Sequence, residues 1–92
     1  MNPRKNVVGP KIRQLRYGQN LTQSQLAARI GRLGWDISRA TLSQIEAQLR
    51  CVSDYELICL AKALGKTAEY LLPAPSQSSK TIAAFFPERP LD

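Results

Sequence analysis

The chain of 92 residues is long enough for one small domain with a single core, because a chain of this length buries only a modest fraction of its surface. Hydrophobic residues make up 43% and charged residues 22%, which is ordinary for a folded globular protein. Residues 1–50 contain nine Lys or Arg and two acidic residues, a net +7, whereas residues 51–92 contain four and five, a net −1, which together give +6. The basic first half favours a polyanionic partner, nucleic acid before membrane.

Several classes of protein are excluded. No apolar run approaches the ~18 residues of a membrane span, and the start of the chain lacks a secretion signal, so we expect a cytoplasmic protein. There is no His, and Cys51 and Cys59 are the only cysteines, so we expect free thiols and no metal site. No phosphate-cradling glycine motif or catalytic carboxylate pair is present, so we expect neither a cofactor nor an enzyme.

Helix-start and helix-stop signals recur along the chain. Thr22 is followed three residues later by Gln25, which is a capping box, and Ser53 with Glu56 repeats it. Pro73 forbids continuation of the last helix. These signals, with further caps and stops, predict helices over residues 10–18, 22–33, 38–48, 53–64 and 67–72. None shows the alternation of a strand, so the predicted fold class is all-α.

The composition changes after Pro73. The stretch "PAPSQSSK" is a Pro/Ser linker, so we divide the chain into a domain, residues 1–73, and a tail, residues 74–92. In the tail, Phe85 and Phe86 follow Ile82 by three and four residues, which is helical spacing. These side chains could dock on their own domain, a second subunit or another protein, or have no role. We favour docking across a homodimer.

The stretch "ISRATLSQIE" has two different faces. Ile37, Leu42 and Ile45 recur at helical spacing, with Leu49 continuing the line, which predicts a core face. The opposite face combines small residues, one arginine and one carboxamide, instead of the paired charges of a merely solvated helix. Its members are Arg39, Ala40, Ser43 and Gln44. This face is predicted to be a contact surface.

The segments "LTQSQLAARIG", "ISRATLSQIE" and "LAKALGKTAEYLL" resemble Cro/CI-type, or XRE-family, helix-turn-helix transcriptional regulators, over about Pro10 to Leu72. The resemblance implies a five-helix, lambda-repressor-like domain whose second and third helices form the DNA-binding unit. It further implies a sequence-specific regulator of double-stranded DNA, a repressor that binds an operator as a homodimer. The alternative is the antitoxin half of a toxin–antitoxin pair, whose apolar tail docks a protein partner.

Carried over by position, the resemblance implies a phosphate contact by Gln23 and base contacts from the face of the third helix. Arginine suits guanine and glutamine suits adenine, while small side chains allow close approach. The expected DNA-binding residues are Gln23, Arg39, Ala40, Thr41, Ser43 and Gln44, with Lys11, Arg13, Arg32 and Arg50 as candidates for phosphate contacts. The alternative for Arg39 and Gln44 is a solvated surface, and Gln23 at a helix start needs no functional explanation.

Family members commonly pair an Arg of the first helix with a Glu at the end of the third helix, which is called the recognition helix because it contacts the bases. Here the corresponding residues are Arg16 and Glu46, so the resemblance implies an ion pair that orients this helix. Two unconnected surface charges are the alternative. Where the family often has Asn-Gly after the Glu, this chain has Ala47 and Gln48, which predicts loss of the tight stop and a helix that continues toward Leu49.

The connection before the recognition helix also departs from the family pattern. The residues "RLGWD", Arg32 to Asp36, make it longer than the short turn of well-known members. Leu33 continues an apolar line, so we expect the second helix to be extended. Trp35 is interpreted as a lid on the core, with a phosphate contact through its indole N–H as the alternative.

Overall fold

The computed structural model describes residues 4–73, which form five α-helices. They are α1 (Gly9–Gly18), α2 (Gln23–Arg32), α3 (Arg39–Glu46), α4 (Asp54–Ala63) and α5 (Ala68–Leu71). Each predicted helix is present and these residues contain no strand, so the all-α prediction is confirmed. Within the same range no helix is both long and apolar enough to cross a membrane. The predicted tail, with Ile82, Phe85 and Phe86, lies outside the described residues.

The predicted caps set the starts of the helices. The Thr22 hydroxyl accepts a hydrogen bond from the Gln25 N–H at 3.0 Å, and the Gln25 side chain accepts one from the Thr22 N–H at 2.8 Å. Ser53 and Glu56 form the same reciprocal pair, at 3.2 and 3.1 Å. These bonds satisfy N–H groups that a helix leaves without an internal partner.

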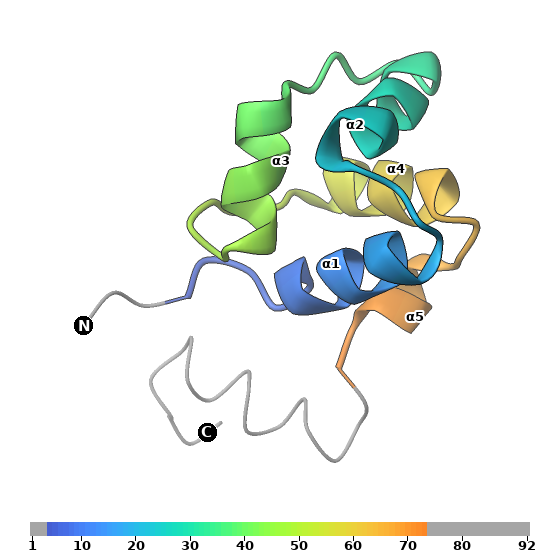
Figure 1. Ribbon diagram of the computed structural model, residues 1–92. Helices are drawn as coiled ribbons and strands as arrows, with labels where there is room; N and C mark the ends of the chain where they lie inside the picture. Colours follow the sequence, from blue (N-terminus) through green and yellow to red (C-terminus); the bar gives the residue numbers. More distant parts are fainter. Residues whose placement is uncertain (1–3, 74–92) are drawn as a thin grey trace, which may run out of the picture.

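The core lies where the helices meet. Figure 1 shows α3 at one side of the bundle, with α1 crossing below it and α2 and α4 beside it. The side chains buried most completely are Ile12, Leu26, Ile30, Leu42, Ile45, Leu60, Leu64 and Leu71. Every helix contributes at least one of these side chains, so all five helices are anchored in one core. This arrangement leaves the outer face of α3 uncovered.

The connection between α2 and α3 differs in part from its prediction. Helix α2 ends at Arg32, and Gly34 turns the chain with a φ of +107°, a conformation that favours glycine. Leu33 is 48% exposed, so the apolar line of α2 ends at Ile30. Trp35 is half-buried and packs against the core, which confirms its interpretation as a lid.

The predicted extension of α3 toward Leu49 is wrong. Gln48 adopts the left-handed conformation, with a φ of +63°, and Leu49 is 59% exposed. The Leu49 N–H donates to the Gln44 carbonyl at 2.8 Å, and the Gln48 N–H to the Ile45 carbonyl at 3.0 Å, which is the Schellman pattern of a helix end. The Gln48 side chain also donates to the carbonyl of Asn6 at 2.9 Å, a tertiary contact that helps to hold this turn.

Candidate nucleic-acid interface

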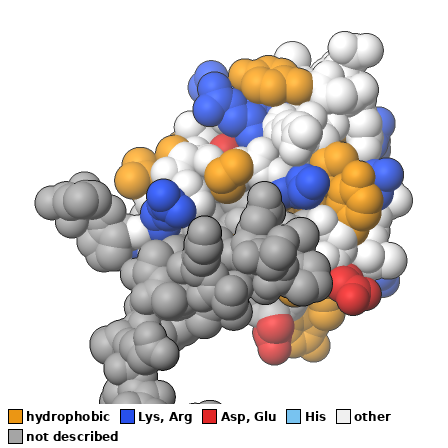
Figure 2. Space-filling view, turned by 90° about the horizontal axis from the view of Figure 1, so that it is seen from below, with side chains coloured by type: hydrophobic (Ala, Val, Ile, Leu, Met, Phe, Trp, Pro, Cys, Tyr) orange, Lys and Arg blue, Asp and Glu red, His pale blue; other side chains and the backbone are white. Residues whose placement is uncertain are grey.

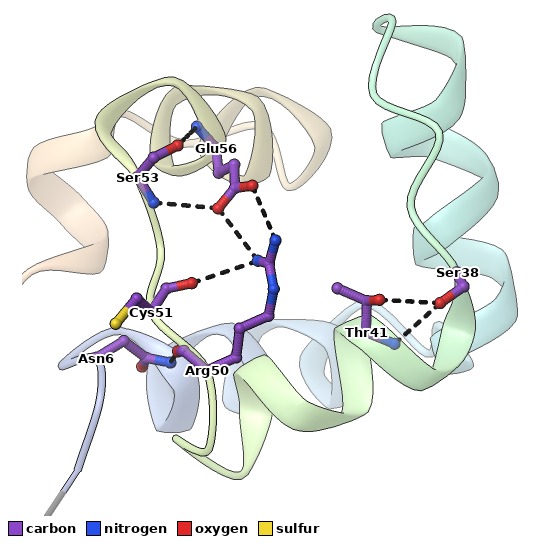
Figure 3. A network of polar contacts seen from close by, with 7 residues as sticks. All are labelled: Asn6, Ser38, Thr41, Arg50, Cys51, Ser53 and Glu56. Atoms are coloured by element: carbon purple, nitrogen blue, oxygen red, sulfur yellow. Dashed lines mark hydrogen bonds and ion pairs between the residues drawn. The ribbon is translucent and has the colours of Figure 1, made fainter.

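The outer face of α3 carries the side chains predicted to read bases. Arg39, Ala40, Ser43 and Gln44 are all exposed. Leu42 and Ile45, on the opposite face, are fully buried. Thr41 is only half-exposed, and its N–H and hydroxyl contact the hydroxyl of Ser38 at 3.1 and 3.0 Å (Figure 3). The structure therefore places Thr41 in the N-terminal cap of α3, beside the predicted reading face.

A hollow of about 650 Å³ lies between α1, the start of α2 and α3. We call it the α3 hollow. Its walls include Arg13 and Tyr17 of α1, Gln23 of α2, and Arg39 and Ser43 of α3. Three helices thus bring predicted base-reading and phosphate-contacting residues to one concave surface.

Arg16 and Glu46 form a salt bridge beneath this surface. The Arg16 Nε and Nη2 donate to the two carboxylate oxygens of Glu46 at 2.7 and 2.9 Å, and both residues are only 6% exposed. The hydrogen bond with Glu46, opposed by burial, raises the pKa of Arg16. Because Arg16 also donates to the Leu21 carbonyl at 2.9 Å, the pair links α1 and the α1–α2 connection to the end of α3. Two unconnected surface charges are excluded.

Gln23 joins the same network. Its Nε2 donates to the Glu46 Oε1 at 3.2 Å, which leaves the side chain half-buried at the first position of α2. The residue lines the α3 hollow, and its phosphate contact stays a prediction. In this structure, however, its amide group is engaged by the carboxylate that also binds Arg16.

The candidate basic residues of α1 face different surfaces. Arg13 lines the α3 hollow. Lys11 instead has its ammonium 5.2 Å from the centre of the Tyr70 ring, in a separate hollow shared with α5. Side chains two residues apart on a helix point in directions about 200° apart, so Lys11 and Arg13 face different surfaces. The structure does not bring Lys11 to the reading face.

The other two candidates lie away from the α3 hollow. Arg50 donates to both carboxylate oxygens of Glu56 at 3.1 Å and to the Cys51 carbonyl at 3.3 Å (Figure 3). Its guanidinium lies 5.8 Å from the centre of the Trp35 ring. Arg32 is exposed at the last position of α2, at the opposite end of that helix from Gln23.

Basic side chains are not confined to the neighbourhood of α3. On the face seen from below in Figure 2, lysine and arginine side chains are spread over the surface, whereas acidic ones gather mainly near one edge. Overall charge therefore indicates a polyanionic partner without locating its binding surface. The candidate surface is α3 with the hollow beside it, where the predicted base-reading residues lie.

Comparison with known proteins identifies the architecture. The Helix-turn-helix family model HTH_3 matches residues 12–71, which include α2 and α3. The chain belongs to the XRE-type helix-turn-helix family. A crystal structure described as the hypothetical transcription factor NHTF from Neisseria is 25% identical, covers 86% of this chain and 84% of its own, and has a TM-score of 0.66. The search of curated proteins gives no match. Together these findings support a DNA-binding transcriptional regulator.

Tyr17 of α1 lines the α3 hollow and was missed by the sequence analysis. Its ring is 58% exposed, with its centre 5.7 Å from the Arg13 guanidinium carbon and 4.6 Å from that of Arg16. The pKa of the Tyr17 phenol is lowered, mainly by Arg13 and to a smaller extent by Arg16, because both cations favour the phenolate. The spacing of Arg13 and Tyr17, four residues apart on one helix face, was the available signal.

Asn6 was also missed, and it supports the helix-turn-helix from beneath. It is 6% exposed, and its Nδ2 donates to the carbonyls of Ile45 and Arg50 at 3.0 and 2.8 Å. Its Oδ1 accepts from the N–H groups of Val8 and Gly9 at 3.1 and 2.8 Å. One buried amide therefore joins the start of α1 to the turn that ends α3. The two bonds that Asn6 donates reach residues 39 and 44 positions away in the chain, and contacts over such a separation leave no signal in local sequence.

Gly9 allows this junction to form. A Cβ atom placed on it would lie 2.3 Å from the Ile45 carbonyl oxygen and 2.9 Å from that of Glu46. The start of α1 thus packs directly against the end of α3, where the positive end of one helix dipole meets the negative end of the other. Only glycine fits there without a shift of the backbone.

Proposed function

We propose that this protein binds a specific operator in double-stranded DNA as a homodimer and acts as a repressor by occupying it. The observation that carries the proposal is the exposed face of α3, whose far end is fixed by the buried Arg16–Glu46 pair. In this arrangement α3 enters the major groove, and α2 crosses the DNA backbone. No catalytic step is required, since occupancy of the operator is itself the regulatory event.

The side chains of the reading face suit particular bases. Arg39 can present two parallel donors to the O6 and N7 of guanine, and Gln44 can donate and accept at adenine. Ala40 and Ser43 are small and exposed between them, which lets the helix approach the base edges closely. The proposal therefore assigns sequence preference to Arg39 and Gln44.

The α3 hollow supports the proposal with groups suited to phosphate. Arg13 and Tyr17 line it on the α1 side, and both can donate to a phosphate oxygen. Gln23 lies at the start of α2, where the helix dipole favours negative charge. On DNA, we infer, the Gln23 amide exchanges Glu46 for a phosphate, while Arg16 keeps the Glu46 carboxylate paired.

The proposed homodimer follows from the size of the domain. One domain covers only a half-site, and two-fold pairing places two recognition helices about one turn of DNA, ~34 Å, apart. Helix α5 offers one surface for this pairing, because Tyr70 is 47% and Leu72 is 42% exposed. Leu71, between them, is buried in its own core and cannot contribute.

Selection of bound sequences from a random DNA pool tests the proposal. On the selected site, Arg39→Ala and Gln44→Ala should each lose ~1–3 kcal/mol of binding free energy and relax preference at one base position. Lys62→Ala is the control, because Lys62 is an exposed basic residue of α4 that lines neither the α3 hollow nor the hollow beside Tyr70. Equal losses on selected and random DNA would show that neither side chain reads bases, and failure to enrich any sequence would reject specific recognition.

A further inference from the structure

A second hollow, separate from the α3 hollow, lies between α4 and the α2–α3 connection. We call it the α4 groove. It encloses about 520 Å³, and its walls include Leu33, Trp35, Tyr55, Ile58, Cys59 and Lys62. Three of its large apolar side chains are well exposed: Tyr55 at 84%, Ile58 at 50% and Leu33 at 48%. Apolar side chains that gather around a concavity, instead of lying singly on the surface, indicate a binding site.

The α4 groove depends on the long connection before α3. That connection supplies Leu33 and Trp35 to one wall, while α4 supplies the other. None of the residues that line this groove also lines the α3 hollow. The α4 groove is therefore physically distinct from the proposed DNA surface, and a ligand could occupy it whether or not the protein binds DNA.

We propose that the α4 groove is the docking site for the segment Ile82–Phe86 of the same chain. Residues 74–92 lie beyond the part of the chain that the structure describes. Ile82, Phe85 and Phe86 would share one face of a helical turn, which gives this segment a compact apolar surface. The groove lining includes Lys62 and Glu56, and the segment is followed by Glu88 and Arg89, so each side offers one charge of each sign.

The intervening chain is long enough. Pro73 directly follows the C-cap of α5, and α5 packs against α4, the helix that forms one wall of the groove. The eleven residues between Pro73 and Phe85 span up to ~40 Å, whereas the ten residues of α4 are only ~15 Å long. A linker of this length holds the segment at an effective concentration of order millimolar. At micromolar protein concentration this favours the same chain over a second copy, in contrast to the docking across a homodimer that we favoured from the tail sequence alone.

The chain contains one tryptophan, Trp35, and it lines the α4 groove, so its fluorescence reports directly on docking. In the full-length protein, the double substitution Phe85→Ser/Phe86→Ser should raise the acrylamide quenching constant of Trp35 about two-fold or more, because the docked population is lost. Ile58→Ser should have the same effect. Its side chain is half-exposed, so the fold should tolerate the change. Combining the three substitutions should add nothing further.

Two controls match these variants. Leu91→Ser alters the tail outside the proposed segment, and Leu49→Ser alters a side chain that is 59% exposed and does not line the groove. Both should leave quenching unchanged, with helicity by circular dichroism equal in all variants. The proposal is overturned if the phenylalanine variant quenches like the wild type. It is also overturned if protection of Trp35 rises with protein concentration alongside a dimer mass in sedimentation, which would assign the groove to the tail of a second copy.

Discussion

Replacement of Glu46 tests how strongly the free energy of unfolding depends on the buried Arg16–Glu46 pair. Glu46→Gln removes the negative charge but keeps the size of the side chain and one acceptor oxygen. Arg16 would then remain 6% exposed, with a full charge and no carboxylate partner. Breaking a buried pair typically costs ~3–5 kcal/mol. Because one acceptor is retained, we expect the lower end, about 3 kcal/mol of unfolding free energy, or a fall in Tm of roughly 12–24 °C.

The matched control is Glu56→Gln. Glu56 also bridges an arginine, Arg50 at 3.1 Å, but those side chains are 22% and 34% exposed. Glutamine can still complete the capping box with Ser53, so this change should cost less than ~1 kcal/mol. Urea denaturation of both variants, with the m-value checked for constancy, measures the difference. Similar losses at the two sites would refute the argument that burial makes the Arg16–Glu46 pair sensitive.

A double-mutant cycle separates charge burial from geometry. Arg16→Met/Glu46→Leu replaces the pair by apolar groups and should recover most of the lost stability. If the pair also orients α3, operator affinity should stay low in this stable variant. Recovery of both stability and affinity would mean that the pair has no positioning role. Additive single effects would mean that the two side chains do not interact energetically.

Three further outcomes are expected. Gly9→Ala should destabilise by ~1–3 kcal/mol in thermal melts, because its Cβ would meet α3 carbonyls, whereas Gly18→Ala, with nothing within 4 Å, should be neutral or stabilising. Burial raises the pKa of Glu56, but hydrogen bonds from Arg50 and Ser53 outweigh it and lower the pKa below 4.5. Its contribution to stability is therefore complete above this value and is lost as pH falls through the folded pKa, a pH dependence that Glu56→Gln should remove in urea titrations. Arg13→Ala should reduce the slope of log affinity against log salt by ~0.9, while Lys11→Ala should leave it unchanged.

Local sequence was sufficient to predict the helices. Capping bonds span three residues, so the starts of α2 and α4 are visible in the pairs Thr22–Gln25 and Ser53–Glu56. The separation of α3 into a buried and an exposed face follows from its period, since Leu42 and Ile45 mark the core side. These features depend on neighbours in the chain, which the sequence displays directly.

The end of α3 could not be predicted in this way. Gln48 is not a residue that commonly ends a helix in the left-handed conformation, and it is held there partly by the backbone of Asn6, 42 residues away. The expected burial of Leu49 failed for the same reason, because the chain turns away one residue earlier. A tertiary contact overrode the local preference, and no periodicity records such a contact.

The candidate site, too, could be predicted only in part from the sequence. The family resemblance identified Arg16 and Glu46 as a pair but could not show that both are buried, nor that Gln23 shares their carboxylate. Lys11 and Arg13 were equivalent as basic residues of one helix. The helical period separates the two side chains, but only the structure shows that Arg13 lines the α3 hollow and that Lys11 lies beside α5.

The proposed recognition helix, α3, is held in place by residues outside its exposed face. Ser38 caps its start, while the Arg16–Glu46 pair, Asn6 and Gly9 hold its end. The exposed reading face, by contrast, adds nothing to the core. Substitutions there should change sequence preference with little change in unfolding free energy, whereas substitutions at the supporting residues should lower stability and affinity together. Because α3 has both ends anchored, substitutions on its exposed face should leave the position of the helix unchanged, so that any change in base preference would come from the substituted side chains alone.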